Sequence, residues 1–487
     1  MKKIIIAFAV VILVLIGLLF YRANSFYSDQ QYVVESPITT VNIDTQAALE
    51  RFSQAIQIPT ISYDDRSQFD QKAFLAFQQY LKTSFPLVHQ KTSLDVINGY
   101  SLLYHLKGSD STLKPALFMG HMDVVPVDEA TAEQWQQPPF SGKVIDGVIW
   151  GRGTIDDKIS VVALMESMEM LLAQNIQPKR SIYFAFGHDE EAGGKDGAKQ
   201  IAAFLAKQNI TFEFVLDEGG VVTQDMLPGV AEPVAVIGIA EKGFVNLRLT
   251  VNAPGGHSSQ PPAHTAAGIL AQAIVKVEAN PFTTDMRFIQ NTFKHIGFAT
   301  DLATRLPMSN LWLFSPAVES MMLKSPSSAA SIRTSTAVTM LKGSSKSNIL
   351  PTQAEAVVNF RILPGDTIQS VTQHITKAIG NPNVKIEAFM TNEASPVSST
   401  ETYGYQLIEQ TIRRLDQNLL VAPYLVQGGT DASNFYGLSD NVYRFMMVRL
   451  NPQTMKRFHG VNEQIAVEDY MQAIQFYYAM VKQAGEG

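Results

Sequence analysis

A histidine and an aspartate two positions apart, His121 and Asp123, follow a short apolar segment at residues 116–120. A carboxylate at this distance can fix the tautomer of a histidine that binds a metal ion. The same spacing also arises by chance, and a solvated loop histidine is the simpler interpretation of His121 taken alone. Metal binding by this pair is therefore indicated only if further ligands lie at the same edge of the fold.

Three more segments, at residues 150–158, 186–194 and 214–220, place acids and glycines after apolar stretches. The acids are Asp156 and Asp157 in the first segment, Asp189, Glu190 and Glu191 in the second, and Asp217 and Glu218 in the third. Neighbouring carboxylates repel one another unless a cation lies close to them. Capping of a helix by Asp156 or Asp157 is an alternative that is compatible with metal binding. Successive strands that deliver acids to one edge indicate bound cations.

Two further histidines complete the candidate set. His257 lies in a glycine- and serine-rich segment at residues 255–262, and His459 lies near the C-terminal end at residues 458–463. The chain contains no cysteine, which excludes disulfides, thiolate catalysis and thiolate-bound metals. A metal ion would therefore be held by imidazole and carboxylate groups.

Taken in order, these motifs resemble those of the M20 family of metallopeptidases. Within that family they look most like the carboxypeptidase S branch, which includes secreted N-fatty-acyl-amino-acid hydrolases. Each motif is weak by itself, but six in the same order are highly specific, and they span nearly everything after the N-terminal apolar segment. The motifs lie at residues 121–123, 151–158, 189–191, 217–220, 256–258 and 459–460.

The resemblance implies a dinuclear site with two Zn²⁺ ions per subunit, although other divalent ions could replace zinc. The implied ligands are His121 and Glu218 for one ion, Glu191 and His459 for the other, and Asp156 as the bridge. Glu218 is preferred to its neighbour Asp217 because the family's ligand directly precedes a glycine, but Asp217 stays an alternative. All of these groups are nitrogen or oxygen donors, as zinc requires in a chain without thiolates.

The resemblance also implies the roles of residues around the metal ions. Glu190 would be the general base, Asp123 the partner of His121, and His257 the group that stabilises the oxyanion. The residues implied in substrate binding are Asn348 and Arg361, which would contact a carboxylate, and Gly429 and Thr430 in a lining loop. Zinc lowers the pKa of bound water to about 7, which suits hydrolysis of an amide at neutral pH.

Alternating strands and helices position the motifs. Strands are expected at residues 116–120, 181–186 and 212–216, and helices at 45–56, 159–172 and 198–207. Repeated βα units predict a mostly parallel, mixed sheet covered by helices on both faces. Sites in such sheets form outside the carboxyl ends of the strands, where these motifs lie. We therefore expect an α/β catalytic domain, and the resemblance implies that it is of the zinc-exopeptidase type.

The pattern changes near residue 240. Apolar and polar residues alternate at 245–251, 336–340 and 354–362, as in half-solvated strands, and helices are expected at 266–278 and 368–379. These elements predict an inserted α+β domain at residues 240–395, between two catalytic parts at 45–239 and 396–487, and the resemblance implies that the inserted domain is a lid. The resemblance implies that the lid can pair two chains into a homodimer. An apolar stretch at 308–322 could line an acyl pocket, form part of the lid core or lie at a dimer surface.

The N-terminal segment resembles a membrane anchor. Lys2 and Lys3 precede an unbroken apolar run at residues 4–20, and Arg22 follows it. Spanning a bilayer takes roughly 17–25 such residues, and the flanking charges orient the rest of the chain outward. We therefore expect a signal anchor at residues 1–25, a tether at 26–44, and a periplasmic or extracellular catalytic domain. A cleaved signal peptide, and hence a secreted protein, is the alternative, because small residues follow at 23–25.

Composition limits the remaining functions. The chain has 487 residues, 46% of them hydrophobic and 17% charged, which suits a folded protein of two domains. The net charge of −7 and the lack of a basic run in the soluble part argue against nucleic-acid binding. We expect zinc-dependent hydrolysis of an amide bond next to a free carboxylate, by a carboxypeptidase or dipeptidase. The alternatives are an N-acyl-amino-acid amidohydrolase and a non-catalytic binding protein, which the complete ligand set and Glu190 disfavour.

Overall fold

The computed structural model describes residues 1–25, 36–38, 40–227 and 229–487. Within these residues, ten strands form a mixed sheet in the order β1-β2-β6-β3-β7-β17-β9-β8-β18, with β16 also paired to β9. The central strands β6, β3, β7 and β17 run parallel to one another, whereas β1, β2 and β6 pair antiparallel. The strands are β1 (Ser93–Ile97), β2 (Ser101–Leu106), β3 (Ala116–His121), β6 (Ile182–Gly187), β7 (Phe214–Asp217), β8 (Val222–Thr223), β9 (Val234–Glu241), β16 (Leu420–Val426), β17 (Val442–Arg444) and β18 (Arg449–Leu450).

Helices cover both faces of this sheet. Along β3, Phe118 packs into the core on one face, and Leu117 and Met119 pack into the core on the other. Burial on both faces explains why the strand is continuously apolar. The first face is covered by α2 (Thr45–Ile56), α3 (Gln71–Ser84), α4 (Pro86–Lys91), α5 (Lys158–Ala173), α13 (Tyr403–Leu415) and α14 (Val467–Glu486), and the second by α6 (Ala198–Lys207). The predicted α/β fold with a mixed, mostly parallel central sheet is confirmed.

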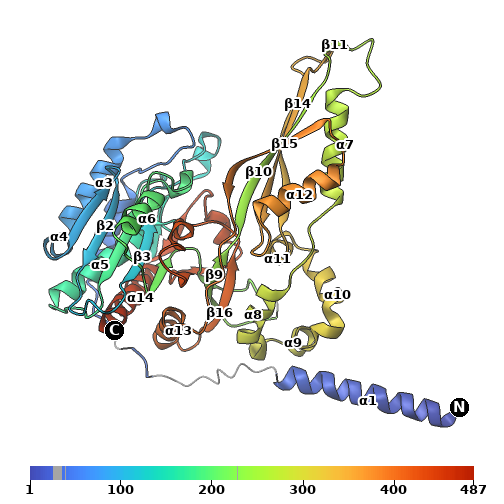
Figure 1. Cartoon of the computed structure of the whole chain (residues 1–487). Coiled ribbons are helices and arrows are strands. Elements are labelled where there is room, and N and C mark those ends of the chain that lie inside the picture. Colours follow the sequence, from blue (N-terminus) through green and yellow to red (C-terminus); the bar gives the residue numbers. More distant parts are fainter. Residues whose placement is uncertain (26–35, 39, 228) are drawn as a thin grey trace.

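A second, antiparallel sheet has the order β12-β14-β10-β15 and projects away from the first (Figure 1). Val245, Leu247 and Leu249 on β10 are buried under α7 and α12, while the alternate residue Arg248 lies nearer the solvent. The predicted alternation therefore marks one covered and one solvated face. The elements are β10 (Gly243–Asn252), β12 (Ser335–Lys342), β14 (Gln353–Ile362), β15 (Val384–Asn392), α7 (Ala266–Ala279) and α12 (Ile368–Ile379).

Two small sheets lie outside these large ones. One joins β11 (Gly256–His257) to β13 (Ile349–Leu350) at the tip of the second sheet (Figure 1). The other joins β4 (Val144–Ile145), β5 (Val148–Trp150) and β19 (Gln464–Ala466). Since β9 ends the first sheet at Glu241 and β10 opens the second at Gly243, the chain changes sheets beside the expected boundary at 240. The domain boundaries themselves stay a prediction.

Helices also surround the foot of the second sheet. They are α8 (Arg287–Ile296), α9 (Leu302–Ser309), α10 (Leu311–Met322) and α11 (Pro326–Ile332). The N-terminal α1 (Lys2–Ser25) runs below them and contacts α9 (Figure 1). Among the described residues, α1 is the one helix long and apolar enough to cross a membrane, with a mean hydropathy of 3.2. The predicted tether at 26–44 lies largely outside the described residues.

Candidate metal centre

His121 stands at the carboxyl end of β3, where parallel strands leave an open edge. Its ring Nδ1 lies 3.0 Å from the backbone oxygen of Asp123, and its Nε2 lies 2.8 Å from Oδ1 of Asp156. A carbonyl oxygen only accepts, so Nδ1 carries a proton. Nε2 is then the ring nitrogen that can bind a metal ion.

Asp156 lies between two histidines that are far apart in the sequence. Its Oδ2 is 2.7 Å from Nε2 of His459, while its Oδ1 faces His121. His459 has a left-handed backbone (φ 56°), which is uncommon for a residue other than glycine and often marks functional sites. Each carboxylate oxygen of Asp156 therefore faces a different imidazole. The peptide bond between Asp156 and Asp157 is cis.

Glu191 completes a compact group with His121 and Asp156, whose possible ligand atoms all lie within 4.8 Å of one another. Its Oε2 is 3.3 Å from Nε2 of His459. Its Oε1 is buried and has no hydrogen-bond partner within the described part of the chain. A buried carboxylate oxygen without a donor is costly in a protein interior, and a cation removes that cost. The donor set, imidazole nitrogen and carboxylate oxygen, fits zinc or another divalent ion.

Asp123 has a wider role than its predicted partnership with His121. Its Oδ1 is 3.4 Å from Nδ1 of His121, so the two residues do lie together. Its two oxygens also accept hydrogen bonds, each 3.1 Å long, from the backbone N–H groups of Glu190 and Glu191. Asp123 thus holds the predicted general base and a predicted ligand in place.

Glu218 follows β7 and is almost fully buried, with 6% of its surface exposed. The Asp217 carboxylate accepts a hydrogen bond of 2.8 Å from the backbone N–H of Ala432, which fixes it toward the loop after β16. Among the described residues, no hydrogen bond reaches the Glu218 carboxylate. Glu218 lies outside the compact group of His121, Asp156 and Glu191, but its freedom from other partners favours it over Asp217 as a ligand.

The buried carboxylates at this edge of the sheet would be stabilised by a nearby positive charge. Burial raises the pKa of Glu190 and of Glu218 well above the usual value, and neighbouring carboxylates add to both shifts. Burial and the nearby Asp156 raise the pKa of Glu191 to about 7. Burial also acts to raise the pKa of Asp156, but hydrogen bonds from His121 and His459 outweigh it and lower that pKa. Divalent cations would stabilise the ionised form of every carboxylate here.

An ion pair that was not predicted holds the backbone next to two predicted ligands, Asp156 and His459. Arg152 Nη1 lies 2.5 Å from Oε2 of Glu463, and both side chains are buried. Glu463 Oε1 accepts hydrogen bonds from the backbone N–H groups of Gly153 and Ile155, just before Asp156. Both charged residues lie within motifs that the sequence singles out, but nothing in the sequence shows that they pair.

The predicted lining residues Gly429 and Thr430 lie in the loop after β16. Gly429 is exposed, whereas Thr430 is buried and donates from both its backbone N–H and its hydroxyl to Oε2 of Glu241. The same oxygen accepts from Nε of Arg444, a fully buried side chain. Thr430 therefore anchors its loop to a buried ion pair that sequence reasoning missed.

The structure does not bring the three predicted lid residues to the metal-ligand group. His257 is exposed on β11, at the tip of the second sheet, where Asn348 accepts a hydrogen bond from the neighbouring Ser258 (Figure 1). Arg361 lies near the other end of β14, opposite Phe244 on β10, with its guanidinium 5.6 Å from that ring. Asn348, just before β13, and Arg361, near the far end of β14, are thus apart from each other, and their roles stay predictions.

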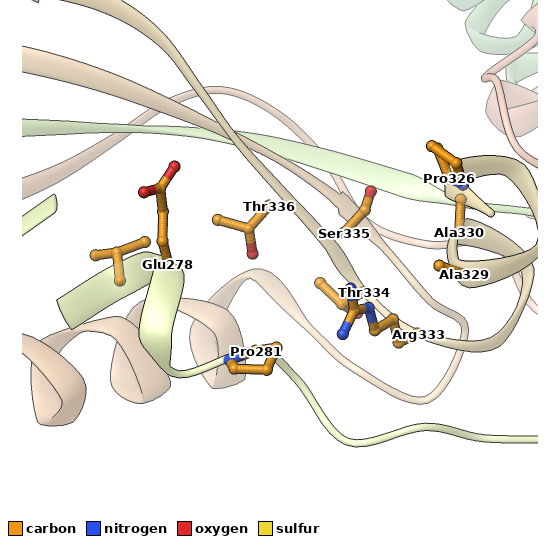
Figure 2. A pocket seen from close by; sticks show the side chains of 10 residues that line it. Glu278, Pro281, Pro326, Ala329, Ala330, Arg333, Thr334, Ser335 and Thr336 are labelled. Atoms are coloured by element: carbon orange, nitrogen blue, oxygen red, sulfur yellow. The ribbon is translucent and has the colours of Figure 1, made fainter. Parts of the chain in front are cut away.

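A cavity of about 310 Å³ lies at the foot of the second sheet (Figure 2). It is lined by Val277, Glu278, Pro281, Pro326, Ala329, Ala330, Arg333, Thr334, Ser335 and Thr336. None of these is a predicted site residue, but Ser335 pairs with Arg361 across β12 and β14. The cavity is therefore a neighbour of the predicted carboxylate-binding residue, and none of the predicted metal ligands lines it.

Comparison with known proteins identifies the family. The model of peptidase family M20/M25/M40 matches residues 117–483, which include every ligand implied above. The chain belongs to this family. The predicted M20 membership and hydrolase class are thereby confirmed, and a candidate metal-binding group of His121, Asp156 and Glu191 is present. The number and identity of the ions belong to the proposal below.

Relatives within the M20 family include both carboxypeptidase S-like proteins and acyl-amino-acid enzymes. The chain is 41% identical, over 89% of its length and 84% of the relative's, to "Probable carboxypeptidase S-like 2" of Dictyostelium discoideum. It is 38% identical, over 90% of its length and 88% of the relative's, to "N-fatty-acyl-amino acid synthase/hydrolase PM20D1" of Homo sapiens.

Solved structures support the same fold. The M20 family metallo-carboxypeptidase Sso-CP2 from Sulfolobus solfataricus aligns with a TM-score of 0.66 at 18% identity, over 91% of this chain and 100% of that one. Human carnosine dipeptidase 1 aligns with a TM-score of 0.62 at 15% identity, over 91% and 96%.

Proposed function

We propose that this M20 chain hydrolyses an amide bond next to a free carboxylate and that it uses two zinc ions to do so. The observation that carries the proposal is the position of Asp156, whose two oxygens face Nε2 of His121 and Nε2 of His459. A bridging carboxylate needs this arrangement. Glu218 would complete the His121 site and Glu191 the His459 site.

Glu190 would move the proton. When bound, the ions supply Lewis-acid chemistry that makes water acidic and polarises a carbonyl oxygen. The Glu190 carboxylate takes one proton from the attacking water as the carbon–oxygen bond forms, and it passes this proton to the leaving nitrogen as the carbon–nitrogen bond breaks. Asp123 orients this base through the backbone N–H of Glu190.

The free carboxylate of the substrate would pair with Arg361. Lys242 donates to the backbone oxygen of Arg333, 2.8 Å away, and Arg361 and Arg333 both act to lower the pKa of Lys242, so basic residues gather around Lys242 at the foot of the second sheet. A guanidinium can bind a carboxylate through two parallel hydrogen bonds. After closure of the lid, this region would hold the anionic group that lies beside the scissile amide.

His257 would stabilise the oxyanion after a movement of the lid. Because it is exposed at the tip of the second sheet, it can reach the metal ligands only through closure of the lid at 240–395 or from a second chain. A donor aimed at the oxyanion contributes roughly 10²–10³ in rate. Closure would also exclude water from the reacting atoms.

Two substrate classes share the required groups. A peptide with a free C-terminus and an N-acyl amino acid both carry an amide bond next to a carboxylate. The carboxypeptidase S-like relative favours the first class and the PM20D1 relatives favour the second. The N-acyl class therefore stands as a specific second candidate.

We further propose that α1 anchors the chain in a membrane, with the catalytic sheet on the outer side. Lys2 and Lys3 before the apolar run support this orientation. The alternative is a cleaved signal peptide that precedes a secreted chain. A chain that is found free of membranes and lacks α1 would contradict the anchor.

The decisive test is Glu190→Gln in the full-length protein, with the exposed Glu278→Gln as the matched control. We expect Glu190→Gln to keep its bound zinc and its thermal stability while it loses hydrolysis of both substrate classes. Assays with dipeptides and with N-acyl amino acids of different tail lengths would then assign the substrate on the wild type. Retained hydrolysis in Glu190→Gln would contradict the general base, and elemental analysis without zinc would contradict the metal mechanism.

A further inference from the structure

The helices α9 and α10 form an apolar hairpin at the foot of the second sheet. Residues 306–318, which join the two helices, contain no aspartate, glutamate, lysine or arginine. One face of the hairpin packs inward, through Met308, Leu311, Phe314, Val318 and Met322, against α8 and α11. Packing against α8 and α11 therefore explains why these five residues are apolar.

The outward face of the same hairpin is also apolar. Trp312 and Leu313, neighbours in the first turn of α10, are 56% and 42% exposed. We call these two residues the outward face. Adjacent large apolar side chains that are exposed mark surfaces that contact another protein or lipid. Among the described residues, no protein segment covers the outward face.

The position of α1 indicates what contacts the outward face. Asn310, between α9 and α10, donates from Nδ2 to the backbone oxygen of Leu19, 3.1 Å away. Leu19 lies within the apolar run of α1, and one turn further on Ala23 is 1% exposed. The hairpin therefore lies beside the C-terminal end of the apolar run. If α1 spans a bilayer, this is the depth at which the acyl chains meet the headgroups.

We propose that the outward face of α10 lies in the outer leaflet of a phospholipid bilayer, beside α1. This inference rests on the proposed anchoring by α1. Trp312 suits the location, because tryptophan is enriched at the boundary between headgroups and acyl chains. Interfacial helices bury their apolar faces about 5–10 Å deep, close to the thickness of one helix. The second sheet would thus be held against the membrane, where amphiphilic acyl substrates dissolve.

The absence of native cysteine provides a direct test, since each introduced cysteine is the only thiol in the chain. The full-length protein would carry Leu313→Cys or Trp312→Cys on the outward face, Ile12→Cys within α1, or Gln373→Cys on the exposed side of α12. Each variant is labelled with an environment-sensitive fluorophore and reconstituted into phosphatidylcholine vesicles. These vesicles contain lipids that carry a quencher near the headgroup or near the chain end.

We expect both outward-face labels to lose fluorescence with the headgroup-proximal quencher, the Ile12 label to lose it with the deep quencher, and the Gln373 label to lose it with neither. Quenching at Ile12 without quenching at Leu313 and Trp312 would overturn the proposed surface and leave the anchor standing. No quenching at Ile12 would refute the anchor and, with it, this inference. Efficient oxidation of Leu313→Cys to a disulfide-linked dimer would show that a second copy covers the face instead.

Discussion

Arg152 and Glu463, which are 311 residues apart in the sequence, form a buried ion pair beside the predicted metal ligands Asp156 and His459. Arg152 Nη2 also donates to the backbone oxygens of His459 and Gly460, at 3.3 and 3.1 Å. Glu463 in turn binds the backbone that leads to Asp156. One charge pair thus fixes the loop of the proposed bridging ligand relative to the loop of His459.

Replacing Glu463 with glutamine should destabilise the protein by about 3–5 kcal/mol, because Arg152 would keep a buried charge without a counterion. Urea unfolding of the metal-free protein would measure this change. The matched control is Glu387→Gln, which removes the exposed partner of Lys385 and should cost at most about 1 kcal/mol. Equal free energies of unfolding for the two variants would show that the buried pair does not hold the loops together.

The sequence predicts the elements of this fold well where one periodicity dominates. α6 and α12 have the predicted bounds, and β3 and β6 lie within a residue of theirs. The antiparallel edge of β1 and β2 was not predicted, because strand direction depends on which strands pair and hydrophobic pattern does not encode that choice. Capping of α5 was a reasonable alternative for Asp157, but its side chain makes no cap hydrogen bond.

The candidate site was predictable to the extent that strand ends converge on one edge. His121 at the end of β3 and Glu191 after β6 follow from that rule. Asp156 does not, because it follows β5 of a separate small sheet, and His459 follows from the family resemblance. The ion pair of Glu241 and Arg444 could not be predicted, because its members show no periodic or motif signal and meet only in the folded chain. The distance of His257 from the ligands depends on the position of the lid, which local sequence does not determine.

Asp123→Asn should lower activity by roughly 10–100-fold, the usual effect of removing a group that orients metal ligands. An amide has one accepting oxygen, so the variant can satisfy only one of the two N–H groups of Glu190 and Glu191. We expect kcat to fall while the thermal midpoint changes little in the presence of zinc. Steady-state kinetics and calorimetry on the same preparation would measure both, and unchanged kcat would contradict the orienting role.

Removing the metal should lower the thermal midpoint, because the buried carboxylates around Glu191 would lose their counterions. A ligand at 1,000 times its dissociation constant stabilises a protein by about 4 kcal/mol, so the shift should be measurable by calorimetry. Dialysis against a chelator, followed by addition of zinc, should lower and then restore both the midpoint and the hydrolysis. His459→Ala should reduce the zinc-dependent part of the shift, whereas His264→Ala, an exposed histidine outside the cluster, should leave it intact.

Lys242 should make the protein more stable as the pH rises above 8. Its side chain is 1% exposed and donates to the backbone oxygens of Ala330 and Arg333, both 2.8 Å away. Burial, together with Arg361 and Arg333, lowers the pKa of Lys242 from 10.5 to about 8. Between these values the unfolded chain binds the proton that the folded chain has lost, so raising the pH favours the folded state.

The measurement is the free energy of unfolding in urea across this pH range, for the wild type and for Lys242→Met. Relative to the variant, the wild type should gain roughly 1 kcal/mol per pH unit above pH 8, close to the limit of about 1.4 kcal/mol for a single proton. Lys377→Met, which removes an exposed lysine of α12, should follow the wild type at every pH. A difference between wild type and Lys242→Met that stays constant with pH would mean that the folded and unfolded chains hold this proton equally.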